Sequence, residues 1–148
     1  MDKNYIQNGL FGGVMPVLAI SAALATTIKT TNTYLIKIDG VISSVAGATL
    51  AALTTAMNVA AASTAVIVVY VNAAGVATYA KSADVLNTAI AANTIFPSTL
   101  AIPDDVPGKA LIGHIIIKTT TTAFTAGTTG LDAATYTLTY ADANRTTK

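Results

Sequence analysis

The stretch Ala65–Val71 (AVIVVYV) limits the possible folds more than any other part of the chain. All of its residues are apolar or aromatic and most are β-branched, which predicts a β-strand without a polar face. Such a strand has to be covered on both sides, inside a sandwich or beneath another subunit. Asn72–Gly75 follows as a type I turn with a bulge, and Val76–Tyr79 predicts the returning strand.

A second hairpin precedes this one. The segment Thr33–Ile38 alternates, with its large apolar residues mainly on one face, as in a half-buried strand. Asp39 and Gly40 form the strongest two-residue hairpin signal in the chain, and Val41–Val45 provides the returning strand. The two hairpins together predict antiparallel pairing.

Three other segments are interpreted as strands. Lys109–Lys118 is a second, almost wholly apolar strand, and Tyr136–Tyr140 alternates as a half-exposed last strand. Within the ambiguous stretch Pro16–Thr31, we expect a strand from about Ala22 towards Thr30, because the residues near its end favour β-structure.

One short helix is expected, over Ser82–Asn93. Ser82 can cap its amino terminus, Asp84 lies in the first turn where it suits the helix dipole, and the apolar residues that follow form one stripe. For Gly47–Ala62, the near-helical spacing of the large apolar residues leaves a short helix and an irregular crossover equally open.

The first 16 residues differ from the rest of the chain. Four large apolar residues, Tyr5, Ile6, Leu10 and Phe11, stand isolated among glycines without a helical or strand period. We expect an arm that becomes ordered only against a partner, with these four residues as its contacts; a disordered terminus is the alternative. Residues 17–148 contain no linker and predict a single β domain.

The predicted fold class is therefore mainly β: an antiparallel sandwich or jelly-roll-like barrel with one short helix and an N-terminal arm. Charged residues make up only 10% of the chain, against about 25% in a typical soluble domain. Much of the surface is therefore expected to be covered by copies of the chain or by a partner. A threonine-rich exterior solvated through its hydroxyls is the alternative.

Composition also argues against several partners. The longest apolar runs fall short of the ~18 residues that a membrane-spanning helix needs, so no membrane association is predicted. The net charge of +1 and the lack of a lysine or arginine cluster disfavour a nucleic-acid surface.

No reactive site is predicted. The chain has no cysteine, so it has neither a thiol nucleophile nor a cysteine-based metal site. The single histidine, His114, has no evident serine or aspartate partner and is interpreted as a core or rim residue. Asp104 and Asp105 offer too few oxygen ligands for calcium. We expect no catalytic residues, no cofactor and no metal, and hence no enzyme.

Four motifs resemble those of a type of tailed-phage virion structural protein. They are IDGV (Ile38–Val41), YVNAAGVATYAK (Tyr70–Lys81), PDDVPGKALIGHIII (Pro103–Ile117) and AFTAGTTGLDAATYTLTYAD (Ala123–Asp142). The likeness covers roughly Thr33–Asp142 and consists of strands and turns, so it points to a β-scaffold and to no site. The N-terminal arm has no counterpart in the pattern, which leaves open how such a chain is anchored.

The resemblance implies a capsid decoration (cement) protein or a head-fibre protein on the capsid surface of the virion. Such a protein contacts the major capsid protein and forms a homo-oligomer, commonly a trimer, and each copy adds buried area across capsomer boundaries. The alternative is a phage tail or baseplate component, or an adhesin that binds a host receptor or carbohydrate through exposed loops such as Ile102–Gly108.

Overall fold

The computed structural model describes residues 9–11, 14–23, 25–90, 106–133 and 136–142. The strands are β1 Gly9–Phe11, β2 Leu18–Ile20, β3 Ile28–Thr30, β4 Tyr34–Ile38, β5 Val41–Val45, β6 Ser63–Val71, β7 Ala77–Lys81, β8 Val85–Leu86, β9 Ala110–Thr119 and β10 Tyr136–Asp142. Two three-residue 3-10 turns, η1 Thr55–Met57 and η2 Asn87–Ala89, are the helical elements of this described part. All of these strand pairs are antiparallel, which confirms the predicted mainly β, antiparallel fold.

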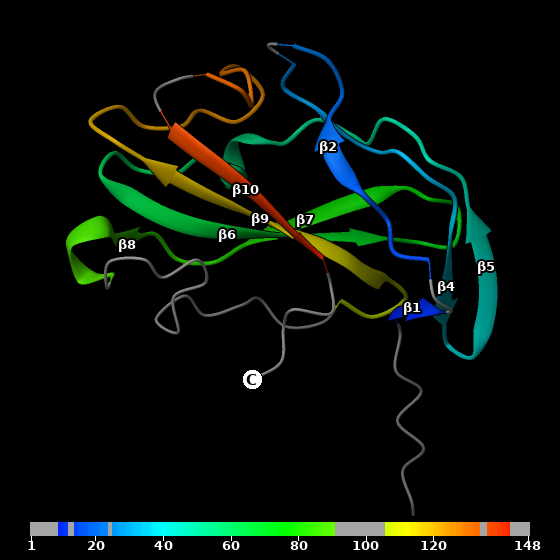
Figure 1. The fold of residues 1–148 in the computed structure, drawn as a ribbon. Coiled ribbons are helices and arrows are strands. Elements are labelled where there is room, and N and C mark those ends of the chain that lie inside the picture. Colours follow the sequence, from blue (N-terminus) through cyan, green and yellow to red (C-terminus); the bar gives the residue numbers. More distant parts are fainter. Residues whose placement is uncertain (1–8, 12–13, 24, 91–105, 134–135, 143–148) are drawn as a thin grey trace, which may run out of the picture.

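Two sheets and a strand pair enclose the main core (Figure 1). The larger sheet has the order β10-β9-β6-β7, and β8 also pairs with β6. The smaller sheet has the order β1-β4-β5, and β2 pairs with β3. Buried residues of the smaller sheet, such as Tyr34 and Ile36, belong to the same hydrophobic cluster as Ile67 and Ile115 of the larger sheet. The fold is thus a β-sandwich.

Strand β6 is buried along its whole length, as its sequence predicts. All nine of its residues are buried. Its alternate residues Ala65, Ile67, Val69 and Val71 belong to the main core. On the opposite face, Val66, Val68 and Tyr70 form a second cluster with Ile116 of β9.

A β-bulge explains why β9 is apolar on consecutive positions. Val69 of β6 pairs with Gly113, but the next residue, Tyr70, pairs with Leu111, so Ile112 is the extra residue of β9. The bulge shifts the alternation of side chains by one position. Ile112 and Ile115 therefore both reach the main core although they are three residues apart.

The predicted helix over Ser82–Asn93 is wrong for the part that the structure describes. Val85 and Leu86 form β8, which pairs with Thr64 and Ser63 of β6. The Ser82 hydroxyl caps no helix; it accepts a hydrogen bond from the backbone N–H of Val66 at 3.0 Å. Pairing with the edge of β6 therefore prevails over a weak local helix preference. Residues 91–93 lie outside the described ranges.

The strand expected from about Ala22 towards Thr30 is correct only at its end, which is β3. Two shorter strands, β2 and β3, occupy Pro16–Thr31, and a bend begins at Ser21 between them. The bend lets β2 and β3 pair with each other, and the Ser21 N–H donates to the Thr27 carbonyl. For Gly47–Ala62, the irregular crossover is correct, with η1 as its only regular turn.

Buried polar groups fasten the β8 segment to the end of the sandwich. Thr119 Oγ1 accepts a hydrogen bond from the Ser63 N–H at 3.0 Å and lies 2.6 Å from the Ala60 carbonyl, to which it donates. The Asn87 amide donates to the Thr119 carbonyl at 2.8 Å and accepts from the Thr64 hydroxyl at 2.7 Å. These bonds satisfy polar groups that β6 and β9 would otherwise bury without partners.

Candidate interaction surface

The β4–β5 hairpin presents an exposed strand at the rim of the smaller sheet (Figure 1). Asp39 and Gly40 form its turn with φ values of 50° and 85°, as a type I′ turn requires. Ile38 and Val41, which flank the turn, are therefore a hydrogen-bonded pair. The two-residue turn predicted from the sequence is confirmed, and it sets the register of the whole hairpin.

This register decides which backbone groups of β5 face outward. Hydrogen-bonded and non-hydrogen-bonded pairs alternate along an antiparallel ladder. Val41, Ser43 and Val45 therefore bond to β4, whereas the N–H and C=O groups of Ile42 and Ser44 point away from it. Beyond the β4–β5 ladder, no backbone hydrogen bond within the described chain involves residues 41–45.

Three apolar side chains of this hairpin are exposed. Val41 is 65% exposed and Ile42 is 48% exposed, and Leu35 of β4 is 38% exposed. Strand β5 (VISSV) contains neither a charge nor a proline, and its pairing with β4 has no bulge. Charges, prolines and bulges are the usual devices that keep a sheet edge from pairing with another chain. This edge therefore has the properties of a protein contact surface.

The far end of β5 is fixed to the sandwich. Val45 is only 6% exposed and belongs to the main core. A Cβ atom built on Gly75, in the β6–β7 turn, would lie 3.0 Å from Cγ1 of Val45, and Gly75 has a φ of +78°. Both the close approach and the positive φ favour glycine at this position. The edge is thus presented from a rigid support.

The four predicted arm contacts fall in different places. Leu10 is partly buried and packs against the main core. Phe11 lies in β1 and pairs with Leu35, so three residues of the arm complete the smaller sheet. Tyr5 and Ile6 lie outside the described residues. The pairing with β4 was not evident from the sequence, because Gly9–Phe11 has no strand period.

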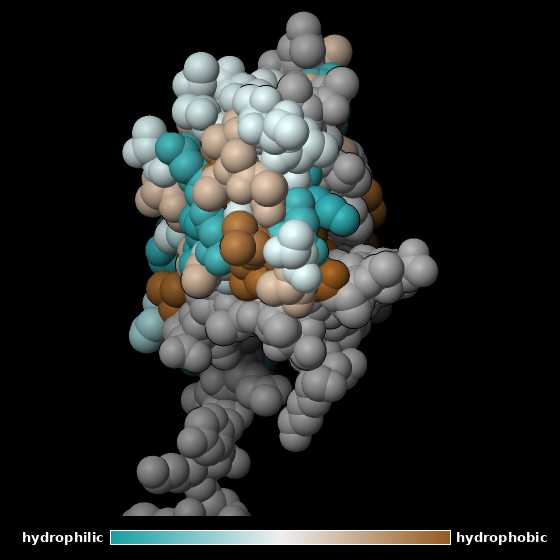
Figure 2. All heavy atoms as spheres, turned by 90° about the vertical axis from the view of Figure 1, so that its left-hand side faces the viewer, coloured by the Kyte–Doolittle hydropathy of each residue, from teal (hydrophilic) through white to brown (hydrophobic). Residues whose placement is uncertain are grey.

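The opposite end of the molecule, which carries β8, has a different surface. Figure 2 shows hydrophobic residues there as small patches between hydrophilic ones. Leu86 of β8 is 60% exposed, but it stands beside Asn87, whose amide is hydrogen-bonded to Thr119. Asp84 accepts a hydrogen bond from the Ala60 N–H and forms an ion pair with Lys81. This end is closed by its own hydrogen bonds and offers no comparable open strand among the residues described.

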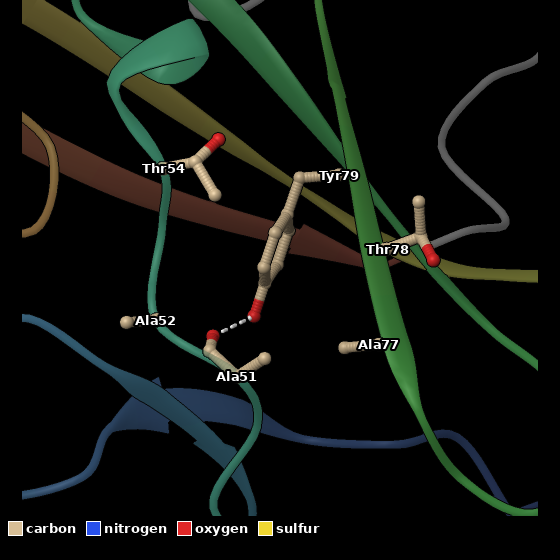
Figure 3. Close-up of a pocket in the computed structure, with 6 residues that line it drawn as sticks. All are labelled: Ala51, Ala52, Thr54, Ala77, Thr78 and Tyr79. Carbon is tan, nitrogen blue, oxygen red and sulfur yellow. Dashed lines mark hydrogen bonds between the residues drawn. The ribbon is translucent and has the colours of Figure 1, made fainter.

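A shallow depression of about 250 Å³ lies between the crossover and β7 (Figure 3). Its lining residues are Ala51, Ala52, Thr54, Ala77, Thr78 and Tyr79. The Tyr79 hydroxyl points to Ala51 and donates to its carbonyl at 2.5 Å, and burial raises the pKa of this phenol. Pockets for small ligands usually measure roughly 300–1,000 Å³ and contain several polar groups aimed inward. The depression has neither property.

The candidate reactive residues do not form a site in the described part of the chain. His114 is fully buried in β9 opposite Val68, as expected for a core histidine. Asp104 and Asp105 fall outside the described ranges. No three histidine, cysteine or acidic side chains come together there as a metal site. None of the helical turns described is long and apolar enough to span a membrane.

Burial also shifts the pKa of a second tyrosine, Tyr34. Tyr34 is 1% exposed within the main core. Desolvation raises the pKa of its hydroxyl, and the nearby Thr30 side chain lowers it by a smaller amount.

Comparison with protein-family models, with curated proteins and with solved structures finds no match to this chain.

Proposed function

We propose that this chain is a non-enzymatic virion structural protein, a capsid decoration (cement) or head-fibre protein that stabilises a phage head through protein contacts. The observation that carries the proposal is the uncharged, exposed edge of β5 on a sandwich whose central strands are buried on both faces. A rigid scaffold with an open apolar edge suits a protein that works by binding neighbours.

The positions of the resembling motifs support the proposal. IDGV forms the β4–β5 turn, and YVNAAGVATYAK spans the β6–β7 turn. In that turn, the Gly75 N–H donates to the Asn72 carbonyl at 2.9 Å, as in the type I turn expected from the sequence. The later motifs enter β9 and β10. The resembling motifs therefore correspond to strands and turns of the sandwich.

The proposed mechanism is mechanical. The partners are the major capsid protein and further copies of the chain, with the trimer implied by the resemblance. An interface of about 1,000 Å² or more per copy is enough for specific binding. Many copies on one capsid then add their contacts through multivalency, so each contact can be modest.

Virions of the phage that encodes the chain provide the test. Quantitative mass spectrometry of purified particles, with a particle reconstruction, measures the copy number and the location of the protein. We expect many copies per particle on the outer surface of the head. A location on the tail or baseplate would favour the adhesin alternative, and absence from the particle would overturn the proposal.

The N-terminal arm gives a second test. A chain that lacks residues 1–8 keeps β1 and the sandwich, and we expect it to lose attachment to capsids if Tyr5 and Ile6 anchor it. Its thermal unfolding should match that of the full chain. Undiminished attachment would remove the arm from the proposed mechanism.

A further inference from the structure

We propose that β5 of one copy pairs with β5 of a second copy, antiparallel, across a two-fold axis that passes beside Ser43. This inference rests on the proposed function insofar as both assign the β4–β5 surface to protein contacts, and it names the partner as a second copy of the chain. The resulting sheet would run β1-β4-β5-β5-β4-β1 through the two protomers.

The backbone of β5 is self-complementary in this register. The outward N–H and C=O groups belong to Ile42 and Ser44, which lie on either side of Ser43. A two-fold axis at Ser43 places Ile42 opposite Ser44 of the second copy, and the reverse. Each of these pairs is then hydrogen-bonded, and Ser43 faces its own copy as the non-hydrogen-bonded pair between them. All outward groups of the two residues gain partners.

The side chains suit the same arrangement. Val41 comes to lie beside Val45 of the second copy, and Ile42 lies diagonally across the axis from its own equivalent, within reach of apolar contact. The second copy would thus cover the two most exposed apolar side chains of the strand, at 65% and 48% exposure. In a two-fold pair any charge on the strand would meet its own sign at close range, and β5 carries none.

A second copy explains the surface better than a strand of another protein does. An unrelated strand needs only one row of free backbone groups, and it sets no condition on the residues at each end. The two-fold arrangement requires free groups placed symmetrically about one residue, an uncharged strand and apolar residues at both ends. Val41–Val45 meets all three conditions. A capsid-protein strand on this edge is the competing outcome.

The expected dimer is weak on its own. Five residues on each copy form the contact, and such a contact is well below the roughly 1,200–2,000 Å² of a stable interface. We therefore expect dimers at protein concentrations of about 0.1 mM and above, corresponding to a dissociation constant in that range. On a capsid, neighbouring contacts would raise the effective concentration.

Proline at position 44 separates edge pairing from folding. The Ser44 N–H points outward, so Ser44→Pro removes a donor of the proposed dimer while it leaves the bonds to β4 in place. Ser44→Ala keeps the N–H and is the matched control. Sedimentation equilibrium over a range of concentrations should show dimers for the wild type and for Ser44→Ala, and at least a tenfold weaker association for Ser44→Pro.

A cross-link tests the two-fold axis itself. The chain has no cysteine, so Ser43→Cys introduces one thiol per copy at the axis, where the facing residues lie within disulfide reach. Oxidation by glutathione should give a covalent dimer. Thr88→Cys, at an exposed position of η2, is the control and should give little. Because Ser43→Cys leaves the outward backbone groups intact, its cross-linking also tests the two-fold pairing if Ser44→Pro fails to fold.

The outcomes are distinct. Equal association of Ser44→Pro and Ser44→Ala, a wild type that remains monomeric at 1 mM, or equal cross-linking of the two cysteine variants would overturn the inference. A trimer that is unaffected by Ser44→Pro, with no dimer of trimers, would also overturn it. These measurements use purified protein, whereas the proposed function is tested on virions. Decoration of heads without β5 pairing would refute only this inference, and β5 pairing in a chain absent from virions would refute only the proposed function.

Discussion

The β6–β9 pair and the β4–β5 hairpin use similar residues in opposite surroundings. Strand β6 has neighbours on both edges and apolar clusters on both faces, and every one of its residues is buried. Among the described strands, β5 has one neighbour, β4, and only Val45 of its five residues is buried. Valine and isoleucine occur in both. The position of a strand in its sheet therefore decides whether its apolar residues hold the fold together or remain free for contacts.

Truncating one isoleucine in each region should show the largest contrast. Ile67→Ala opens a cavity in the main core, where Ile67 has no exposed surface, and should cost about 2–5 kcal/mol of unfolding free energy. Ile42→Ala removes a half-exposed side chain and should change the unfolding free energy by about 0.5 kcal/mol or less. Urea unfolding of both variants measures the difference. Comparable losses would mean that β5 contributes to the fold as much as β6 does.

Loss of the hydrogen bonds of the buried Thr119 hydroxyl should have an intermediate effect on the unfolding free energy. Thr119→Val keeps the shape of the side chain but leaves the Ser63 N–H and the Ala60 carbonyl without their partner. Unsatisfied buried groups of this kind cost about 1–3 kcal/mol. Thr122→Val, at an exposed position nearby, is the control and should be almost neutral. If the two variants have the same unfolding free energy, the hydrogen bonds of Thr119 do not stabilise the β8 end.

Tyrosine ionisation should give a smaller, pH-dependent effect. Burial raises the pKa of Tyr79 and of Tyr34 in the folded chain, above the value of about 10 for an unfolded tyrosine. The unfolded chain therefore loses these protons first, and the unfolding free energy should be constant up to about pH 10 and fall above it. Tyr79→Phe should reduce the slope of this fall.

Tyr79→Phe also loses the hydrogen bond to Ala51, which should lower the unfolding free energy by roughly 0.5–1.5 kcal/mol at neutral pH. Chemical unfolding from pH 7 to 11 measures both effects. An unchanged slope in Tyr79→Phe would show that this phenol ionises as freely in the folded chain as in the unfolded one.

The sequence predicts the hairpins well because their signals are local. The Asp39-Gly40 turn joins adjacent strands, and the continuous apolar run of β6 requires cover on both faces. The helix over Ser82–Asn93 fails because its cap signal serves a distant partner: the Ser82 hydroxyl binds the Val66 N–H. Local preference cannot reveal a hydrogen-bond partner that lies sixteen residues away in the sequence.

The candidate surface was harder to predict than the fold. A returning strand is expected at Val41–Val45, but the sequence does not show that no other described strand pairs with the outer side of β5. The strand VISSV does carry a usable signal, since it lacks both the alternation of a half-buried strand and the charges of a protected edge. The large apolar residues of the arm give a more visible signal in the sequence, but Leu10 among them packs against the core.

Amide hydrogen exchange tests the contrast between the two regions most directly. In dilute protein, the amides of β6 and β9 should exchange slowly, and those of Ile42 and Ser44 should exchange fast, while Val41, Ser43 and Val45 are protected by β4. At about 1 mM protein, Ile42 and Ser44 should become protected as the edge is covered. Protection of these two amides in dilute protein, or free exchange at every concentration, would contradict the assignment of β5 as the contact edge.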